Sequence, residues 1–149
     1  VACLNKEREF LSVRRGPTDI INPGFWEFPG GHVDDSDDSI EAGAVRELQE
    51  EANVRVLPEN LIYLGLTHQI QPSIKDPNVG ASIRKHFFLA LQWENEAKIV
   101  PNPKTGILEH DGLQSAPKSY IESLENTEIP IYLVNKALKI QERKQNDQD

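Results

Sequence analysis

Residues 30–54 read GGHVDDSDDSIEAGAVRELQEEANV, and this stretch decides the fold and the chemistry that the sequence predicts. Its centre is RELQEE at residues 46–51. On a helix with about 100° between residues, Glu47, Glu50 and Glu51 fall within an arc of roughly 100°. Carboxylates at this spacing repel one another, so the pattern predicts that a cation binds beside them. Carboxylate oxygens are ligands of the kind that Mg²⁺ and Mn²⁺ prefer.

The acidity of the chain is concentrated in this stretch. The 149 residues carry a net charge of −8, and residues 34–51 hold eight acids against the single base Arg46. One arginine does not balance eight acids, which favours a cation site over a salt-bridged surface helix. An acidic chain also disfavours nonspecific binding to nucleic acid, although bound cations reverse the sign of the charge locally.

The two ends of the predicted helix have their own signals. Upstream, the pair Gly30 and Gly31 lets the backbone approach the carboxylates closely. Asp38 followed by Glu41 three residues later matches a capping box, so a helix is predicted over residues 39–52 with Asp38 as its N-cap. Asn53 suits the left-handed position at which a helix ends.

Outside this stretch, apolar runs separated by turn residues predict an alternation of strands and helices. Strands are expected at residues 1–4, 10–13, 25–28, 54–56, 61–67 and 82–93, loops at 16–24, 68–81 and 94–106, an irregular segment or short strand at 107–113, and helices that end at 124 and begin at 130. Gly65 is a candidate bulge. We expect one domain over residues 1–140 and a polar tail over residues 141–149.

Composition predicts the cellular setting. No apolar run approaches the roughly 18 residues of a membrane span. The single cysteine, Cys3, lies in an apolar run, which predicts a buried structural thiol and a reducing compartment. With no signal peptide visible, we expect a cytoplasmic protein without a membrane partner.

The central stretch resembles the Nudix (MutT-type) hydrolase family, whose signature is G-x5-E-x7-R-E-U-x-E-E-x-G-U with U aliphatic. Gly31, the run at 46–51 and Val54 match it, and WEFPGG at 26–31 is similar to the family's usual lead-in. The resemblance implies an α/β/α sandwich in which a mixed sheet lies between helices.

Two positions depart from the signature. Gly31 is followed by five residues before Asp37 with one extra residue before Arg46, or by six residues before Asp38. The loop therefore carries a one-residue insertion, which a surface loop tolerates, and an Asp where the family has Glu. Asn53 replaces the family's glycine.

The resemblance implies cleavage of a nucleoside diphosphate derivative between its phosphates, with Mg²⁺ or Mn²⁺ as cofactor. By position, Glu47, Glu50 and Glu51 are the expected catalytic carboxylates and metal ligands, and the Gly31 carbonyl completes the site. Arg46 and Asp38 are the expected structural residues of the motif. Glu50 is the first candidate general base, and two loop acids, Glu109 and Asp111, are the runners-up.

Substrate contacts have weaker signals, because each candidate is also a common polar or aromatic residue at a strand end or in the core. The candidates are Arg14, Arg15, Phe25, Glu27, His68, Arg84 and Glu109. Capped RNA is a further candidate substrate, and the chain is expected as a monomer or homodimer.

Two alternatives to hydrolysis are open. The first is a Nudix-fold regulator that binds a nucleotide or RNA with weak or lost turnover. The second, isomerase chemistry on a diphosphate, is disfavoured because Cys3 is badly placed to catalyse it.

Overall fold

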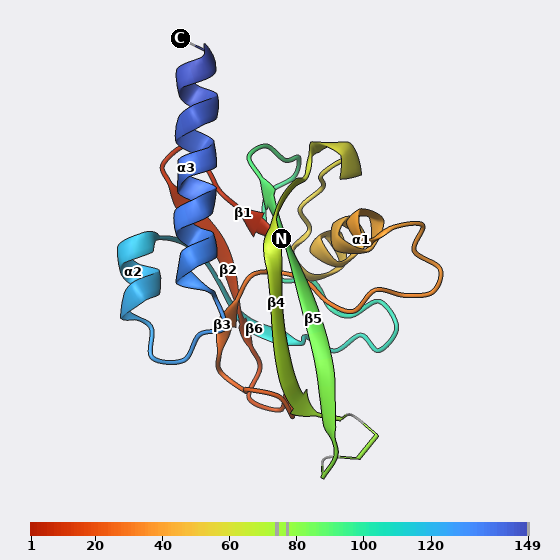
Figure 1. Ribbon diagram of the computed structural model, residues 1–149. Helices are drawn as coiled ribbons and strands as arrows, with labels where there is room; N and C mark the ends of the chain where they lie inside the picture. The colour runs from red at the N-terminus through yellow and green to blue at the C-terminus, as the bar shows by residue number, and fades with distance from the viewer. Residues whose placement is uncertain (74, 77, 149) are drawn as a thin grey trace.

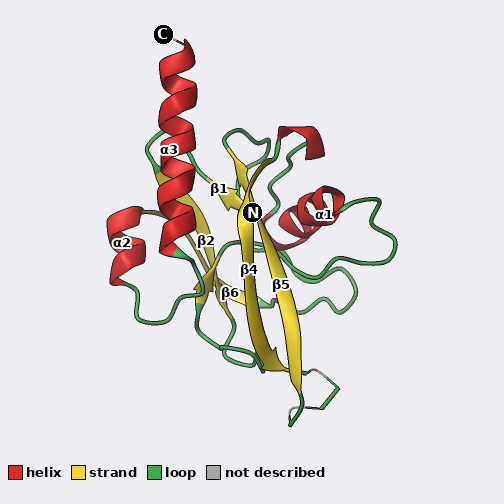
Figure 2. Cartoon of the chain, in the orientation of Figure 1, coloured by secondary structure: helices red, strands yellow, loops and turns green. Residues whose placement is uncertain are grey.

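The computed structural model describes residues 1–73, 75–76 and 78–148, and it has three layers (Figures 1 and 2). Two three-stranded sheets lie in the middle, with α1 on one side and α2 and α3 on the other. The predicted α/β sandwich with a mixed sheet between helices is therefore confirmed. In chain order the elements are β1 (Ala2–Cys3), β2 (Glu9–Arg15), β3 (Trp26–Glu27), α1 (Ile40–Ala52), a 3₁₀ turn η1 (Pro58–Asn60), β4 (Ile62–Pro72), β5 (Gly80–Ala90), β6 (His110–Pro117), α2 (Lys118–Ser123) and α3 (Ile131–Gln148).

The two sheets meet beside β1. The first sheet has the order β1-β5-β4, with β1 parallel to β5 and β4 antiparallel to it. The second has the order β3-β2-β6 and is antiparallel throughout. Leu4 joins them, because its N–H donates to the Ala90 carbonyl at 3.0 Å while it also forms an antiparallel bridge with Phe10.

Successive side chains along residues 2–4 pack into two separate hydrophobic cores, one on each side of the sheets. Ala2 and Leu4 pack into the core that contains Leu133 of α3. Cys3 packs into the core that contains Leu48 of α1. The alternation follows from the two-residue period of a strand, which sends successive side chains to opposite faces.

The ends of α1 correct one prediction and confirm another. The N-cap is Ser39, whose hydroxyl accepts a hydrogen bond from the Ala42 N–H at 3.0 Å, so the capping box based on Asp38 is wrong. At the other end, Asn53 has φ of 61° and its N–H donates to the Gln49 carbonyl at 3.1 Å. Asn53 therefore occupies the left-handed position predicted for it.

The β4–β5 hairpin is longer than the sequence predicts. Residues 68–81 were expected to form a loop, but β4 extends to Pro72 and β5 begins at Gly80. This outer half of the hairpin extends beyond the body of the molecule (Figure 1). The predicted bulge is present, because the register shifts between Tyr63 and Gly65.

Three other segments differ from or extend beyond the expected elements. Residues 54–56 form only a single bridge, between Arg55 and Glu94, instead of a strand. Of the segment at 107–113, residues 110–113 belong to a strand, β6, which continues to Pro117. Helix α3 runs to Gln148, and the buried Gln141 donates from Nε2 to the Asn5 carbonyl at 2.8 Å. The domain boundary at 140 stays a prediction, and residue 149 of the expected tail lies outside the described residues.

No helix in the part of the chain that the structure describes combines the length and apolar character needed to cross a bilayer.

Candidate active site

Helix α1 places its carboxylates against the loop that precedes it. Leu48 and Ala52 are fully buried and hold one side of the helix against the sheet. On the neighbouring side, a Cβ added to Gly31 would lie 2.5 Å from the Glu47 carboxyl carbon. A side chain at residue 31 would displace the Glu47 carboxylate, so glycine at this residue allows the loop and the carboxylate to lie this close together.

The Arg46 guanidinium is the cation at the centre of the acidic cluster. Its Nε donates to Asp37 Oδ1 at 2.9 Å, and its Nη1 donates to Glu47 at 2.9 Å and to Glu50 at 3.1 Å. Nη2 adds a hydrogen bond to the His32 carbonyl at 3.1 Å. Arg46 therefore ties the acidic loop to the helix.

Asp37, not Asp38, occupies the structural position in this cluster. The Asp37 side chain is only 6% exposed, and its Oδ2 also accepts from the Asp34 N–H at 2.8 Å. The hydrogen bond from Arg46 lowers the pKa of Asp37. Gly43 makes room for this carboxylate, because a Cβ there would lie 2.9 Å from Asp37 Oδ2. Asp38 is exposed, so the expected role of Asp38 beside Arg46 is corrected to Asp37.

The carboxylates of α1 are partly withdrawn from water. Burial raises the pKa of Glu51 to about 8, even though Oε2 accepts a hydrogen bond from the Gly30 N–H at 2.9 Å. Burial also raises the pKa of Glu47. A carboxylate that is costly to ionise in isolation is stabilised when a cation binds beside it.

These donors fit a divalent cation in their chemistry, because they are hard carboxylate oxygens gathered on one side of a helix. Within the described ranges, no three His, Cys, Asp or Glu side chains already surround one point as a metal site would. Glu47 and Glu50 both accept hydrogen bonds from Arg46 Nη1. These two carboxylates are therefore held by arginine in this structure.

A wall of charged side chains stands beside α1. Glu27 of β3 accepts hydrogen bonds from Arg15 Nε at 3.0 Å and pairs with His110 Nε2 at 3.0 Å. Glu128 pairs with Arg15 Nη2 at 3.2 Å and with Lys85 Nζ at 3.4 Å. Burial by itself lowers the pKa of His110, but Glu27 and the nearby Glu51 outweigh it, so the pKa is raised. We call Arg15, Glu27, Lys85, His110 and Glu128 the charged wall.

Residues of the charged wall line two cavities. One, of about 260 Å³, contains Phe28 and is called the Phe28 cavity; its apolar lining includes Ile21, Val33, Ile40, Ile83 and Phe87. The other, of about 300 Å³, contains the carboxylates of α1 and is called the α1 cavity. Arg15, Glu27, Gly30, Gly31 and His32 line both. The two cavities therefore meet at the glycine pair.

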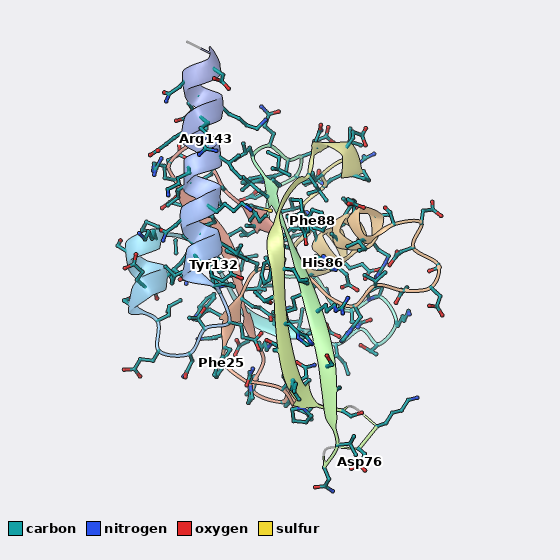
Figure 3. The ribbon with its side chains drawn as sticks, in the orientation of Figure 1. Phe25, Asp76, His86, Phe88, Tyr132 and Arg143 are labelled. Carbon is teal, nitrogen blue, oxygen red and sulfur yellow. The ribbon has the colours of Figure 1, made fainter. Side chains whose placement is uncertain are left out.

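Four of the seven candidate substrate residues line these cavities: Arg15, Glu27, Arg84 and Glu109. The other three, Arg14, Phe25 and His68, line neither. Arg14 instead pairs with Asp111 at 2.7 Å and lies over the Trp26 ring, and His68 contacts Ser82. Phe25 lies apart from His86 and Phe88 of β5, which line the Phe28 cavity (Figure 3).

Sequence reasoning missed three residues of this region: Asp37 as the partner of Arg46, and His110 and Glu128 in the charged wall. Asp37 had a signal, because it stands at the family's spacing from Gly31. His110 and Glu128 had none, because their roles depend on contacts with Glu27 and Arg15, which lie 83 and 113 residues away in sequence.

Known proteins are similar to this chain in sequence and in fold. The family model described as the NUDIX domain matches residues 1–117. An 8-oxo-dGTP diphosphatase of Proteus vulgaris is 36% identical over 96 residues, which cover 64% of this chain and 75% of that protein.

Two solved structures share the fold at low identity. A MutT protein from Methanosarcina mazei Go1 superposes with a TM-score of 0.66 at 20% identity, covering 96% of this chain and 90% of that one. An Ap4A hydrolase of C. elegans superposes with a TM-score of 0.60 at 18% identity, covering 94% and 93%.

Proposed function

The chain belongs to the Nudix hydrolase family, and from this premise we propose that it hydrolyses a nucleoside diphosphate derivative with divalent cations held by α1. The observation that carries the proposal is the group of Glu47, Glu50 and Glu51 beside the Gly31 loop, at the meeting of two cavities. We propose Mg²⁺ as the cation, with Mn²⁺ as its substitute. The single domain is proposed to span residues 1–140.

The residues of α1 divide into ligands and a support. We propose that Glu47, Glu50, Glu51 and the Gly31 carbonyl hold the metal, while Arg46, anchored by Asp37, keeps the loop and helix together. When bound, the cation neutralises the diphosphate, polarises the reacting phosphorus and lowers the pKa of water. In phosphoryl transfer this electrostatic positioning supplies most of the catalysis.

The reaction also needs a proton acceptor. We propose that Glu50 takes a proton from the attacking water as the water oxygen bonds to phosphorus. The bridging oxygen leaves with the departing phosphate, so the products are two phosphate-bearing fragments. Glu109 is the alternative acceptor, but Asn102 Nδ2 already donates to its Oε1 at 2.7 Å. Asp111 is a weaker choice because it pairs with Arg14 outside both cavities.

The Phe28 cavity is proposed to receive the nucleoside. Its apolar and aromatic lining suits the faces of a base, and the adjoining α1 cavity suits the diphosphate. Because the relative from Proteus vulgaris is an 8-oxo-dGTP diphosphatase, 8-oxo-dGTP is the first substrate to test. Dinucleoside polyphosphates, ADP-ribose and capped RNA complete the panel.

The test is product formation from this panel in the presence of Mg²⁺ or Mn²⁺. We expect at least one substrate to be cleaved between phosphates, and Glu50→Gln to lower kcat by about 10² to 10⁴ without changing the fold. Folding is checked by circular dichroism. Absence of product from every substrate, with folded protein, would contradict the proposal. Calorimetric binding without product would instead support the regulator alternative.

A further inference from the structure

Lys104 stands apart from the other cations that line the α1 cavity. Arg46 is paired with carboxylates of the acidic cluster, and Arg15 and His110 are paired within the charged wall. Among the described residues, no carboxylate lies within ion-pair distance of the Lys104 ammonium group. The α1 cavity is rich in acids, so a lysine at its edge without an ion pair is available to an anion that enters with the substrate.

A tight turn fixes the place of Lys104. The Lys104 N–H donates to Asn102 Oδ1 at 2.8 Å, and the Gly106 N–H donates to the Asn102 carbonyl at 2.7 Å. Asn102 Nδ2 in turn donates to Glu109 at 2.7 Å. Gly106 has φ of 71°, a conformation that glycine adopts without strain. The turn is therefore closed by its own hydrogen bonds before any ligand arrives.

The turn is also attached to the end of α1. The Lys98 N–H donates to the Ala52 carbonyl at 3.0 Å, and the Val100 N–H donates to the Glu51 carbonyl at 3.3 Å. Because Glu51 is one of the carboxylates that face the cavity, the same backbone that positions the reaction centre positions the turn. The backbone of Lys104 thus has a defined place relative to the carboxylates of α1, and its exposed side chain extends from there.

The two cavities give the substrate a direction. Lys104 lines the α1 cavity but not the Phe28 cavity, and the residues common to both lie at the charged wall and the glycine pair. A nucleoside in the Phe28 cavity with its first two phosphates beside α1 would extend its far end toward the turn. An ammonium group at that end favours an anionic group over a neutral one.

We propose that Lys104 contacts the phosphate beyond the two that flank the cleaved bond, and that it selects nucleoside triphosphates over substrates without that phosphate. The inference rests on the proposed function, because it takes the nucleoside to bind in the Phe28 cavity and the cleavage to occur beside α1. Lys104 would thus contact the leaving group of the proposed reaction.

The test compares two substrates that differ only in the third phosphate: 8-oxo-dGTP and 8-oxo-dGDP. We expect Lys104→Ala to lower kcat/KM for the triphosphate about 5- to 20-fold, as for one charge-assisted contact in a solvated site. Activity on the diphosphate should stay within about twofold, since no group there reaches the lysine. Lys104→Arg should keep most of the preference for the triphosphate. Lys104→Glu should lower kcat/KM for the triphosphate more than Lys104→Ala does, because the carboxylate repels the third phosphate.

Lys98→Ala is the matched control. Lys98 lies on the same loop and carries the same charge, but it lines neither cavity. This variant should change both substrates equally, and by little. Equal losses on both substrates with Lys104→Ala, or an equal effect of the two lysine variants, would overturn the inference while leaving the proposed hydrolase intact.

A second measurement separates failure of the inference from failure of the proposed function. If the wild-type protein cleaves nothing, calorimetry with α,β-methylene analogues of dGTP and dGDP in Mg²⁺ takes the place of the rate. Weaker binding of only the triphosphate analogue by Lys104→Ala supports the contact, and unchanged or equally weakened binding of both overturns it.

Discussion

At the scale of single residues, Asp37 and Asp38 are adjacent in the chain and differ completely in their surroundings. Asp37 accepts from Arg46 Nε and from the Asp34 N–H, whereas Asp38 is exposed. We expect Asp37→Asn to lower activity about tenfold, because losing a charge-assisted hydrogen bond loosens the arginine beside the proposed metal ligands. The matched variant Asp38→Asn should retain activity within about twofold.

The readout that distinguishes positioning from general destabilisation is the Mg²⁺ concentration at half-maximal rate. It should rise in Asp37→Asn, since Glu47 and Glu50 share Arg46 with Asp37. Similar Mg²⁺ dependence in the two variants would show that Asp37 does not position this site.

Residue types that act through their own chemistry were predictable from the sequence, and residues that act through distant partners were not. Glu47, Glu50 and Glu51 follow from the helical period alone, which places them together before any tertiary contact forms. The structural role beside Arg46 was assigned to Asp38 instead of Asp37, because the capping pattern favoured the residue nearer the helix. The N-cap belongs to Ser39, which leaves Asp37 free to bind Arg46.

At the scale of elements, the approach of the Gly30-Gly31 loop to α1 determines where Glu47 lies. A Cβ at residue 31 would lie 2.5 Å from the Glu47 carboxyl carbon, whereas a Cβ at residue 30 would meet only the Val1 nitrogen at 3.9 Å. We expect Gly31→Ala to lower kcat about 10²-fold, because a displacement of about 1 Å at a reacting group costs that much. Gly30→Ala is the control and should cost far less.

Thermal unfolding of both variants accompanies the rate measurements. Glu47 is at the surface of its cavity and can turn away, so Gly31→Ala should unfold near the wild-type temperature. A large loss of stability with a proportionate loss of rate would contradict a local effect on Glu47.

Elements with an amphipathic pattern were predictable, and elements stabilised mainly by their partners were not. Helix α1 and the bulge at Gly65 follow from periodicity and from glycine. The outer hairpin does not, because the β4 segment beyond Thr67 is polar and pairs only with β5, so it carries no core-facing pattern. Residues 54–56 show the reverse case: Val54 and Val56 are buried beside α1, yet only Arg55 forms a bridge.

At the scale of the whole molecule, Glu128 connects segments that are distant in the chain. Burial raises the pKa of Glu128, but Asn22, Lys85 and Arg15 outweigh it and the pKa is lowered. A lowered folded pKa means that the unfolded chain binds the proton more readily. This stabilisation is therefore present above the ordinary glutamate pKa of about 4.3 and is lost as the pH falls through the folded pKa.

We therefore expect Glu128→Gln to be less stable than the wild type by about 1 kcal/mol at pH 7, a value kept small because Lys85 and Arg15 are still partly exposed to solvent, which screens the pairs. The difference in unfolding free energy between the wild type and Glu128→Gln should shrink as the pH falls from about 5 to below about 4, because Glu titrates in this range. Urea denaturation at a series of pH values measures it. Glu125→Gln, an exposed acid in the same loop, should show no such convergence, and matching curves for the two variants would contradict the role of Glu128.

The position of Glu128 also bears on how such a chain changes its substrate. The family match ends at residue 117, yet Glu128, which lies just before α3, completes the wall of the Phe28 cavity. The proposed metal ligands and one residue of the proposed nucleoside cavity thus lie in separate stretches of sequence. Among the described residues, Glu128 alone in the segment 118–148 lines the Phe28 cavity. Exchange of this segment between related chains would therefore change the charge of that cavity at one position while leaving the sequence of α1 unaltered.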